Sequence, residues 1–87
     1  LWLQILINSL EHISVYPNPS DGIITIDIAQ DAQYAVKIVD LRGKLIYEGD
    51  IYNSTKVNLS EYNKGIYLIS LIDKSSKDVH VKKLIVR

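Results

Sequence analysis

The chain lacks cysteine, phenylalanine and methionine altogether, and it has no excess of either charge. Without cysteine it has neither a disulfide framework nor a thiol nucleophile. A formal net charge of zero argues against a nucleic-acid partner, because phosphate binding requires an excess of Lys and Arg. The strongly apolar stretch at residues 1–10 is shorter than the roughly 20 residues that span a bilayer, so we do not expect a membrane-spanning segment.

Catalytic and metal-binding patterns are scarce as well. The two histidines, His12 and His80, have no spacing typical of a zinc site, and His80 lies between two valines in a strand pattern, where we expect it to face solvent. Asp21, Asp27 and Asp31 lie close together, but their spacing matches no EF-hand loop, which leaves calcium as a minor alternative. We expect no enzyme activity, no cofactor and no metal.

What the chain does contain is tyrosine and alternating apolar segments. Its aromatic residues are six tyrosines and one tryptophan, and tyrosine suits a thin sandwich because the ring packs while the hydroxyl stays hydrated. Ile24, Ile26 and Ile28 alternate with polar residues, which is typical of a half-buried strand. Patterns of this kind predict about seven strands, at residues 13–16, 24–28, 34–39, 44–48, 51–59, 66–73 and 78–87.

Turn residues separate these segments. The pair of prolines at residues 17–19 predicts a stiff, extended elbow, Gly49 with Asp50 predicts a break, and Ser60 caps one helical turn in the loop at residues 60–65. The connections are too short for helical crossovers, so the sequence predicts an all-β fold, a small immunoglobulin-like antiparallel β-sandwich. Tyr67 either pins the loop before it, as the tyrosine corner of such folds does, or serves as a core aromatic residue.

Charge is distributed unevenly along the chain. Residues 11–31 contain four acidic residues and no Lys or Arg, whereas residues 74–87 contain five basic residues and one acidic residue. Either the first and last strands complement each other or lie in solvent, or the basic end is a recognition surface. Lys82 and Lys83 also have a simpler explanation, since lysines on an edge strand discourage edge-to-edge pairing.

Four short segments occur in a fixed order: Tyr16-Pro17-Asn18-Pro19-Ser20-Asp21-Gly22, Val39-Asp40-Leu41-Arg42-Gly43-Lys44, Gly65-Ile66-Tyr67-Leu68 and Lys82-Lys83-Leu84-Ile85-Val86-Arg87. With them, residues 13–87 resemble the C-terminal sorting domain of the type IX (Por) secretion system of Bacteroidota, type A. Residues 1–12 are then an apolar leader, a linker or the end of a preceding region. The family's motifs fall on Tyr16, Pro17, Asn18, Pro19, Gly22, Asp40, Gly43, Lys44, Gly65 and Tyr67, and the terminal sorting signal falls on Lys82, Lys83, Leu84, Ile85 and Val86, with Arg87 after it.

The resemblance implies a non-catalytic secretion and sorting signal, which directs its cargo protein through the periplasm and across the outer membrane. It implies two partners, the type IX secretion machinery and its sortase-like cysteine protease. That protease removes the domain and attaches the cargo to the cell surface, so the cargo is expected to be secreted or held on the outer membrane. The physical reading of residues 82–87 is that their lysines offer charge contacts and their backbone offers an edge for strand addition.

The alternative is an immunoglobulin-like accessory module that binds carbohydrate or protein at the cell surface. Such modules display exposed aromatic side chains, and the candidates in this chain are Trp2, Tyr47, Tyr52 and Tyr62. Exposed strand edges and the apolar residues 1–10 also leave self-association open.

Overall fold

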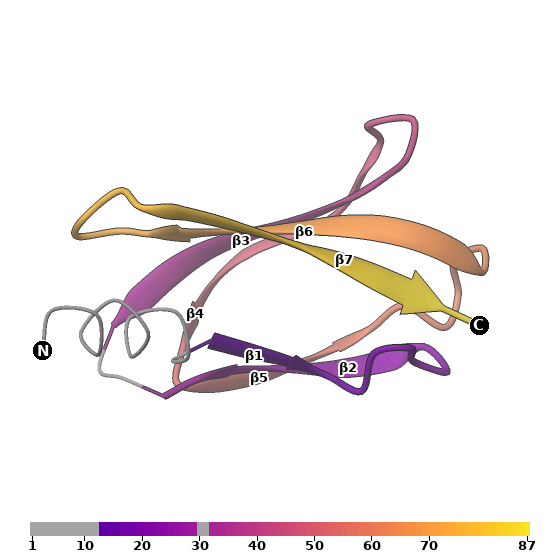
Figure 1. The fold of residues 1–87 in the computed structure, drawn as a ribbon, viewed down its shortest axis with the longest axis horizontal. Coiled ribbons are helices and arrows are strands. Elements are labelled where there is room, and N and C mark those ends of the chain that lie inside the picture. The colour runs from indigo at the N-terminus through magenta and orange to yellow at the C-terminus, as the bar shows by residue number, and fades with distance from the viewer. Residues whose placement is uncertain (1–12, 30–31) are drawn as a thin grey trace, which may run out of the picture.

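The computed structural model describes residues 13–29 and 32–87, so the predicted leader at residues 1–12 lies outside the described residues. Two antiparallel sheets pack face to face, and the predicted all-β sandwich is confirmed (Figure 1). The strands are β1 (Ile13–Tyr16), β2 (Ile23–Ile28), β3 (Gln33–Asp40), β4 (Leu45–Tyr52), β5 (Ser54–Asn58), β6 (Gly65–Asp73) and β7 (Val79–Val86).

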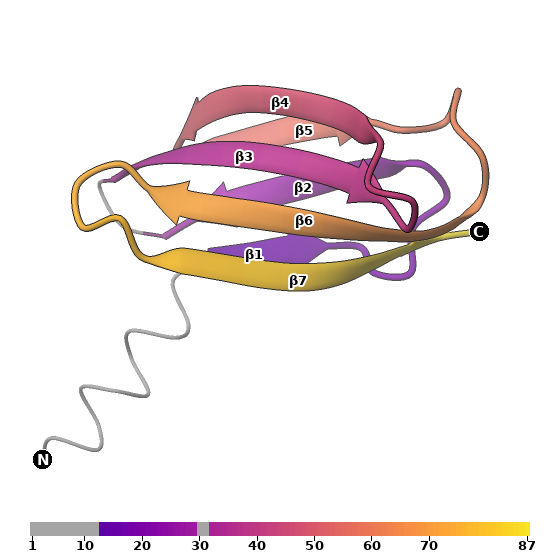
Figure 2. The same ribbon diagram turned by 90° about the horizontal axis from the view of Figure 1, so that it is seen from above.

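The strand order is that of immunoglobulin-like sandwiches. One sheet has the order β1-β2-β5, and the other has the order β4-β3-β6-β7. The chain therefore crosses from one sheet to the other after β2, β4 and β5, and β3 with β4 and β6 with β7 are hairpins. In these orders β7 is an edge strand, and it lies beside β1, one of the two edge strands of the other sheet (Figures 1 and 2).

The core lies between the two sheets and follows the alternation seen in the sequence. Ile24 and Ile26 of β2 are fully buried, and Lys37 of β3 points outward between two buried neighbours. Apolar residues from all seven strands and from the residue after β5 form this core: Ile13, Ile24, Ile26, Ile28, Tyr34, Val36, Ile38, Ile51, Val57, Leu59, Tyr67, Ile69, Leu71, Leu84 and Val86.

The predicted break at Gly49 and Asp50 is wrong, because β4 continues through both residues to Tyr52. A Cβ built on Gly49 would lie 3.1 Å from the Tyr47 hydroxyl oxygen, so glycine leaves room for that ring rather than ending the strand. The chain turns instead at Asn53, whose φ of 69° is left-handed. The predicted strand at residues 51–59 is therefore split between the two sheets, its second part being β5.

The predictions for Ser60 and His80 are also wrong. The loop at residues 60–65 contains a turn and no helical turn, and Ser60 donates to the Asn58 side chain instead of capping a helix. His80 does not face solvent freely, because it is half-buried with its ring 6.3 Å from that of Tyr34. It lies on the inward side of β7, two residues before Lys82 and four before the buried Leu84, which the alternation of the strand requires.

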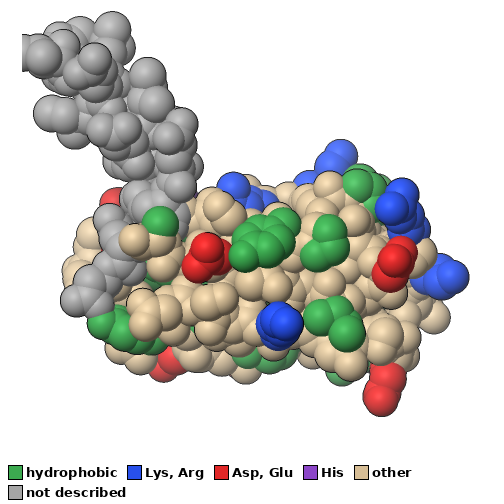
Figure 3. Space-filling view, turned by 90° about the horizontal axis from the view of Figure 1, so that it is seen from below, with side chains coloured by type: hydrophobic (Ala, Val, Ile, Leu, Met, Phe, Trp, Pro, Cys, Tyr) green, Lys and Arg blue, Asp and Glu red, His purple; other side chains and the backbone are tan. Residues whose placement is uncertain are grey.

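Both outer faces of the sandwich carry exposed apolar side chains. On the outer face of the three-stranded sheet, separate apolar side chains lie among polar and charged ones (Figure 3). The exposed apolar residues of this sheet include Tyr16 of β1 and Ile23 of β2. On the four-stranded sheet, the apolar side chains of Leu68 in β6 and Val81 in β7 are exposed to solvent. Within the described residues no helix is long and apolar enough to cross a membrane.

Candidate functional site

The motif segments lie far apart in the sequence but meet at one end of the sandwich. β1, β3, β5 and β7 all end there, and β2, β4 and β6 begin there (Figure 2). The loop at residues 17–22, the β3–β4 turn at residues 41–44, the loop at residues 59–64 and Arg87 therefore share this end, which we call the motif end. Antiparallel strands bring every second connection to the same end of a sandwich, and most of the residues predicted as motif positions lie in those connections or in the strand ends beside them.

The first and last motif segments are hydrogen-bonded to each other. The Asn18 side chain donates from Nδ2 to the Lys83 carbonyl oxygen at 2.8 Å and accepts from the Ile85 N–H at 3.0 Å. The backbone of Ser20 then continues the ladder, donating to Ile85 and accepting from Arg87 at 2.8 and 2.9 Å. We call these four hydrogen bonds the clasp. They cover the outer edge of β7 from Lys83 to Arg87, so this edge is no longer open to another strand.

The clasp separates the residues of the predicted sorting signal into buried and accessible ones. Leu84 is fully buried and Val86 is 4% exposed, so both belong to the core. Lys82 is half-buried on the same inward side, while Lys83 is exposed and Ile85 is half-buried on the outer face. A partner that meets the folded domain can therefore contact part of this segment only.

Ser20 has a larger structural role than its place in the motif suggested. It is 1% exposed, its hydroxyl donates to the Ile23 carbonyl at 3.0 Å, and it accepts from the Gly22 N–H at 2.9 Å. The signal that could have revealed it is the Ser-x-Gly spacing, because a serine hydroxyl often accepts from the N–H two residues later.

Gly22 fastens the first loop to the loop that follows β5. Its φ of +135° suits glycine, and a Cβ there would lie 2.9 Å from the Cβ of Ser60. Its carbonyl accepts from the Leu59 N–H. In the same loop as Gly22, the peptide bonds before Pro17 and Pro19 are both cis.

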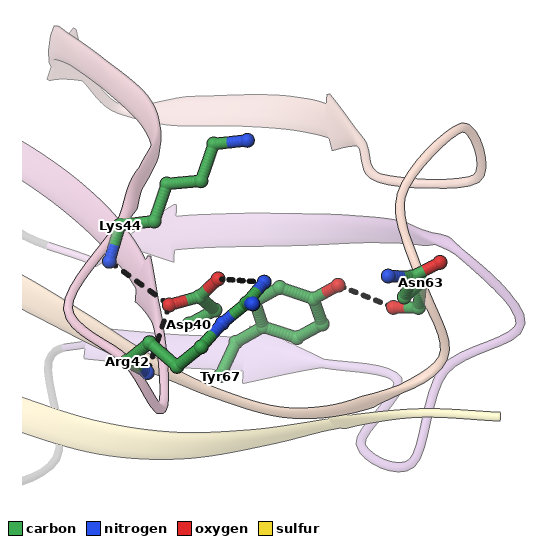
Figure 4. Close-up of polar contacts among 5 residues, drawn as sticks. All are labelled: Asp40, Arg42, Lys44, Asn63 and Tyr67. Atoms are coloured by element: carbon green, nitrogen blue, oxygen red, sulfur yellow. Dashed lines mark hydrogen bonds and ion pairs between the residues drawn. The ribbon is translucent and has the colours of Figure 1, made fainter.

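Asp40 organises the turn between β3 and β4 (Figure 4). Its Oδ1 accepts from the backbone N–H groups of Arg42 and Lys44, each at 2.9 Å, and its Oδ2 lies 3.6 Å from the Arg42 guanidinium. The Lys44 N–H, followed by the Arg42 N–H and charge, holds the pKa of Asp40 below its usual range despite partial desolvation. Gly43 supplies the left-handed residue of the turn, with φ of +87°.

Tyr67 fills both of the roles that the sequence left open. Its ring is 4% exposed and belongs to the core, and its hydroxyl donates to the Asn63 carbonyl four residues earlier (Figure 4). This is the tyrosine-corner arrangement, which fixes the loop at residues 59–64 against β6. Asn63 was not among the predicted residues, because it contributes a backbone oxygen and its side-chain type carries no signal.

The acidic and basic ends of the chain make limited contact. Among the described residues, one ion pair joins the two stretches, Arg87 Nε to Asp21 Oδ1 at 3.8 Å, and both side chains are largely exposed. An exposed pair of this length contributes little stability. No ion pair to Lys82 or Lys83 occurs in residues 13–29 and 32–87, so their ammonium groups remain available to a partner.

The residues named for the alternative functions are scattered. Tyr52 and Tyr62 are both exposed but lie at opposite ends of the sandwich, Tyr47 is half-buried, and Trp2 lies outside the described residues. The described part of the chain holds no group of three or more His, Cys, Asp or Glu side chains suited to a metal ion, and Asp31 lies outside that part.

Comparison with known proteins gives this geometry a context. Residues 14–87 match the family described as secretion system C-terminal sorting domain. An endo-acting ulvan lyase of Formosa agariphila is 31% identical over 98 aligned residues, which cover the whole chain and 19% of that protein. An ulvan lyase of Nonlabens ulvanivorans is 34% identical over 76 residues, which cover 85% of the chain and 14% of that protein. The chain thus spans less than a fifth of the length of either relative.

Proposed function

The chain belongs to the secretion system C-terminal sorting domain family, and on that premise we propose that it is the signal by which a cargo protein leaves the cell through the type IX secretion system. The single observation that supports this most directly is the family match over residues 14–87. The gathering of the motif segments at one end of the fold is in accord with it, because a signal shared by different cargo proteins needs one common surface.

The proposed route passes through the periplasm and across the outer membrane. The type IX machinery recognises the domain, a sortase-like cysteine protease removes it, and the cargo stays on the cell surface or enters the medium. The domain itself performs no catalysis in this scheme. Because both relatives are named as ulvan lyases and the chain matches a small part of each, we propose that the cargo is a secreted enzyme.

The proposed recognition surface is the accessible part of residues 82–87. Leu84 and Val86 keep β7 in the sheet by burying their side chains, whereas the exposed Lys83 and the accessible part of the half-buried Lys82 are left for a partner. Strand addition along this segment is less favourable than the sequence indicated, because Asn18 and the backbone of Ser20 already occupy that edge. Charge contacts are therefore the main mode of recognition that we propose.

The test is an export assay that keeps the fold intact. The whole 87-residue chain is fused behind a periplasmic signal peptide and a fluorescent reporter, in a Bacteroidota strain with a working type IX system and in an isogenic strain without its translocon. We expect reporter on the surface or in the medium of the first strain and in the periplasm of the second. Equal export from both strains refutes the proposal.

A pair of double variants locates the recognition surface. Lys82→Gln/Lys83→Gln removes the two lysines of the terminal segment, and Lys56→Gln/Lys77→Gln removes the same charge from exposed positions elsewhere. We expect the first to leave the reporter in the periplasm and the second to be exported normally. Deleting residues 84–87 is a poorer test, because it removes the buried Leu84 and so confounds recognition with unfolding.

A further inference from the structure

A cleft opens at the motif end between the β3–β4 turn and the loop at residues 59–64. Its volume is about 280 Å³, close to the lower limit for small-molecule pockets. The hairpin turn contributes Leu41, Arg42 and Lys44 to its walls, and the loop contributes Tyr62 and Lys64. Figure 4 shows the turn and the loop on the two sides of this space, with the Tyr67 hydroxyl directed toward the loop.

The cleft has more positive than negative charge. Three cationic side chains line it, those of Arg42, Lys44 and Lys64, against the single carboxylate of Asp40. That carboxylate is already engaged by two backbone N–H groups and by the Arg42 guanidinium. No ion pair to Lys44 or Lys64 occurs in the part of the chain that the structure describes.

Of the motif residues around the cleft, Lys44 has the least structural explanation. Asp40 and Gly43 build the turn, and Tyr67 fixes the loop, so the fold alone accounts for them. The backbone of Lys44 contributes an N–H to Asp40, but its side chain makes no hydrogen bond or ion pair among the described residues and extends away from the turn (Figure 4). An ammonium group at the rim of a cavity is well placed to contact a bound anion.

We propose that this cleft binds one acidic sugar residue, a saccharide unit bearing a carboxylate or a sulfate. The cationic groups of Arg42, Lys44 and Lys64 contact the anionic group. The exposed ring of Tyr62 and the side chain of Leu41, which is 67% exposed, offer apolar surface for the C–H face of the sugar. This activity is separate from the proposed sorting role.

The shape of the cleft favours a sugar over an acidic peptide. A peptide that binds in an extended form needs a free strand edge or a long groove, and the nearby edge of β7 is covered by the clasp from Lys83 to Arg87. The cleft instead has the size of a single compact group, with polar and apolar walls next to each other. Aromatic and cationic side chains around one small cavity suit a charged ring.

The experiment titrates the 87-residue chain with a chondroitin 4-sulfate tetrasaccharide, followed by NMR amide shifts and calorimetry. Parallel titrations use the unsulfated tetrasaccharide, neutral cellotetraose, sodium sulfate alone and a hexaglutamate peptide. We expect saturable binding of an acidic tetrasaccharide with shift changes around Tyr62 and Lys64, and no binding of cellotetraose. Binding of the unsulfated form identifies the carboxylate as the recognised group, and its failure beside binding of the sulfated form identifies the sulfate.

A matched pair of charge variants tests whether the saccharide binds at the cleft. Lys44→Gln/Lys64→Gln should weaken binding by at least about tenfold, because each charge-assisted contact contributes about that factor. Lys56→Gln/Lys77→Gln carries the same change in net charge elsewhere and should change the affinity by less than about twofold. Circular dichroism verifies that both variants fold.

Three results overturn the proposal. The first is the absence of saturable binding by either acidic tetrasaccharide. The second is equal weakening by the two double variants, which indicates attraction to overall charge. The third is tighter binding of hexaglutamate than of the saccharides, which makes the cleft a protein-docking site. Each result leaves the export assay unaffected, so failure here is distinct from failure of the sorting role.

Discussion

Removing the side chain of Asn18 should loosen the last strand of the domain. Asn18→Ala deletes the hydrogen bonds from Asn18 Nδ2 to the Lys83 carbonyl and from the Ile85 N–H to Asn18 Oδ1. The two backbone groups lie at an exposed edge, so water can satisfy them after the substitution and no buried polar group is left unpaired. We therefore count only the net worth of two hydrogen bonds, about 1–2 kcal/mol of the free energy of unfolding.

That loss is large enough to measure in a domain of this size. For 60–100 residues, 1 kcal/mol corresponds to a shift in Tm of about 4–8 °C, so we expect a decrease of about 5–15 °C. Urea denaturation followed by tyrosine fluorescence gives the free energy directly. Hydrogen exchange should show faster exchange of the Ile85 amide, which loses its acceptor, than of the Ser20 amide, whose acceptor remains.

Asn58→Ala is the matched control. The Asn58 side chain also accepts two hydrogen bonds, but both come from Ser60, two residues away. Such local contacts persist in part in the unfolded chain, so their loss should cost about 0.5 kcal/mol or less. Equal destabilisation by the two substitutions, together with unchanged protection of the Ile85 amide, would refute the view that Asn18 holds the terminal strand.

Three further predictions concern the scaffold around the motif end. Gly22→Ala combines backbone strain with a Cβ placed 2.9 Å from the Ser60 side chain, and denaturation should show a loss of about 2–4 kcal/mol; a loss below 1 kcal/mol contradicts the packing described. Leu84→Ala leaves a cavity at a fully buried position and should cost about 2–5 kcal/mol, which an unchanged urea midpoint would rule out. The pKa of Asp40 lies below its ordinary value of 3.8 in the folded chain, chiefly because the Lys44 N–H donates to the carboxylate. The ionised carboxylate therefore stabilises the fold above pH 3.8, and this stabilisation is lost as the pH falls through the lower pKa of the folded state. As the pH is lowered from about 6 to about 2, the urea midpoint should therefore fall less steeply for Asp40→Asn than for the original chain. The same dependence of the midpoint on pH in both proteins would count against this role of Asp40.

Much of the fold could be predicted because strand periodicity is a local property. The alternation at Ile24, Ile26 and Ile28 placed these residues in the core, and all three are buried. The prediction of a break at Gly49 was wrong because a residue distant in the sequence decides its conformation. Its local context favours a turn, but pairing with Val36 of the neighbouring strand β3 makes it part of β4, and that pairing cannot be seen within a short window of sequence.

Some features of the candidate site could likewise be predicted from local sequence, and others could not. The turn residues Asp40 and Gly43 act within four residues of themselves, so their pattern in the sequence is sufficient to identify them. The accessible and buried members of the terminal segment could not be separated before the sheet was known. Leu84 and Ile85 are equally apolar by type, and the direction that each faces depends on the pairing of β7 with β6.

The sequence by itself determined an all-β chain, the positions of most of its turns and the buried face of its most regular strands, such as Ile24, Ile26 and Ile28 of β2. Those features follow from the two-residue repeat of an extended backbone and from the backbone preferences of glycine and proline. The tertiary structure alone decided that Asn18 hydrogen-bonds to β7, across a separation of 65 residues to Lys83 and 67 residues to Ile85. A side-chain amide can satisfy any exposed backbone pair, so its partner is fixed only when the two sheets pack and bring one particular edge beside it.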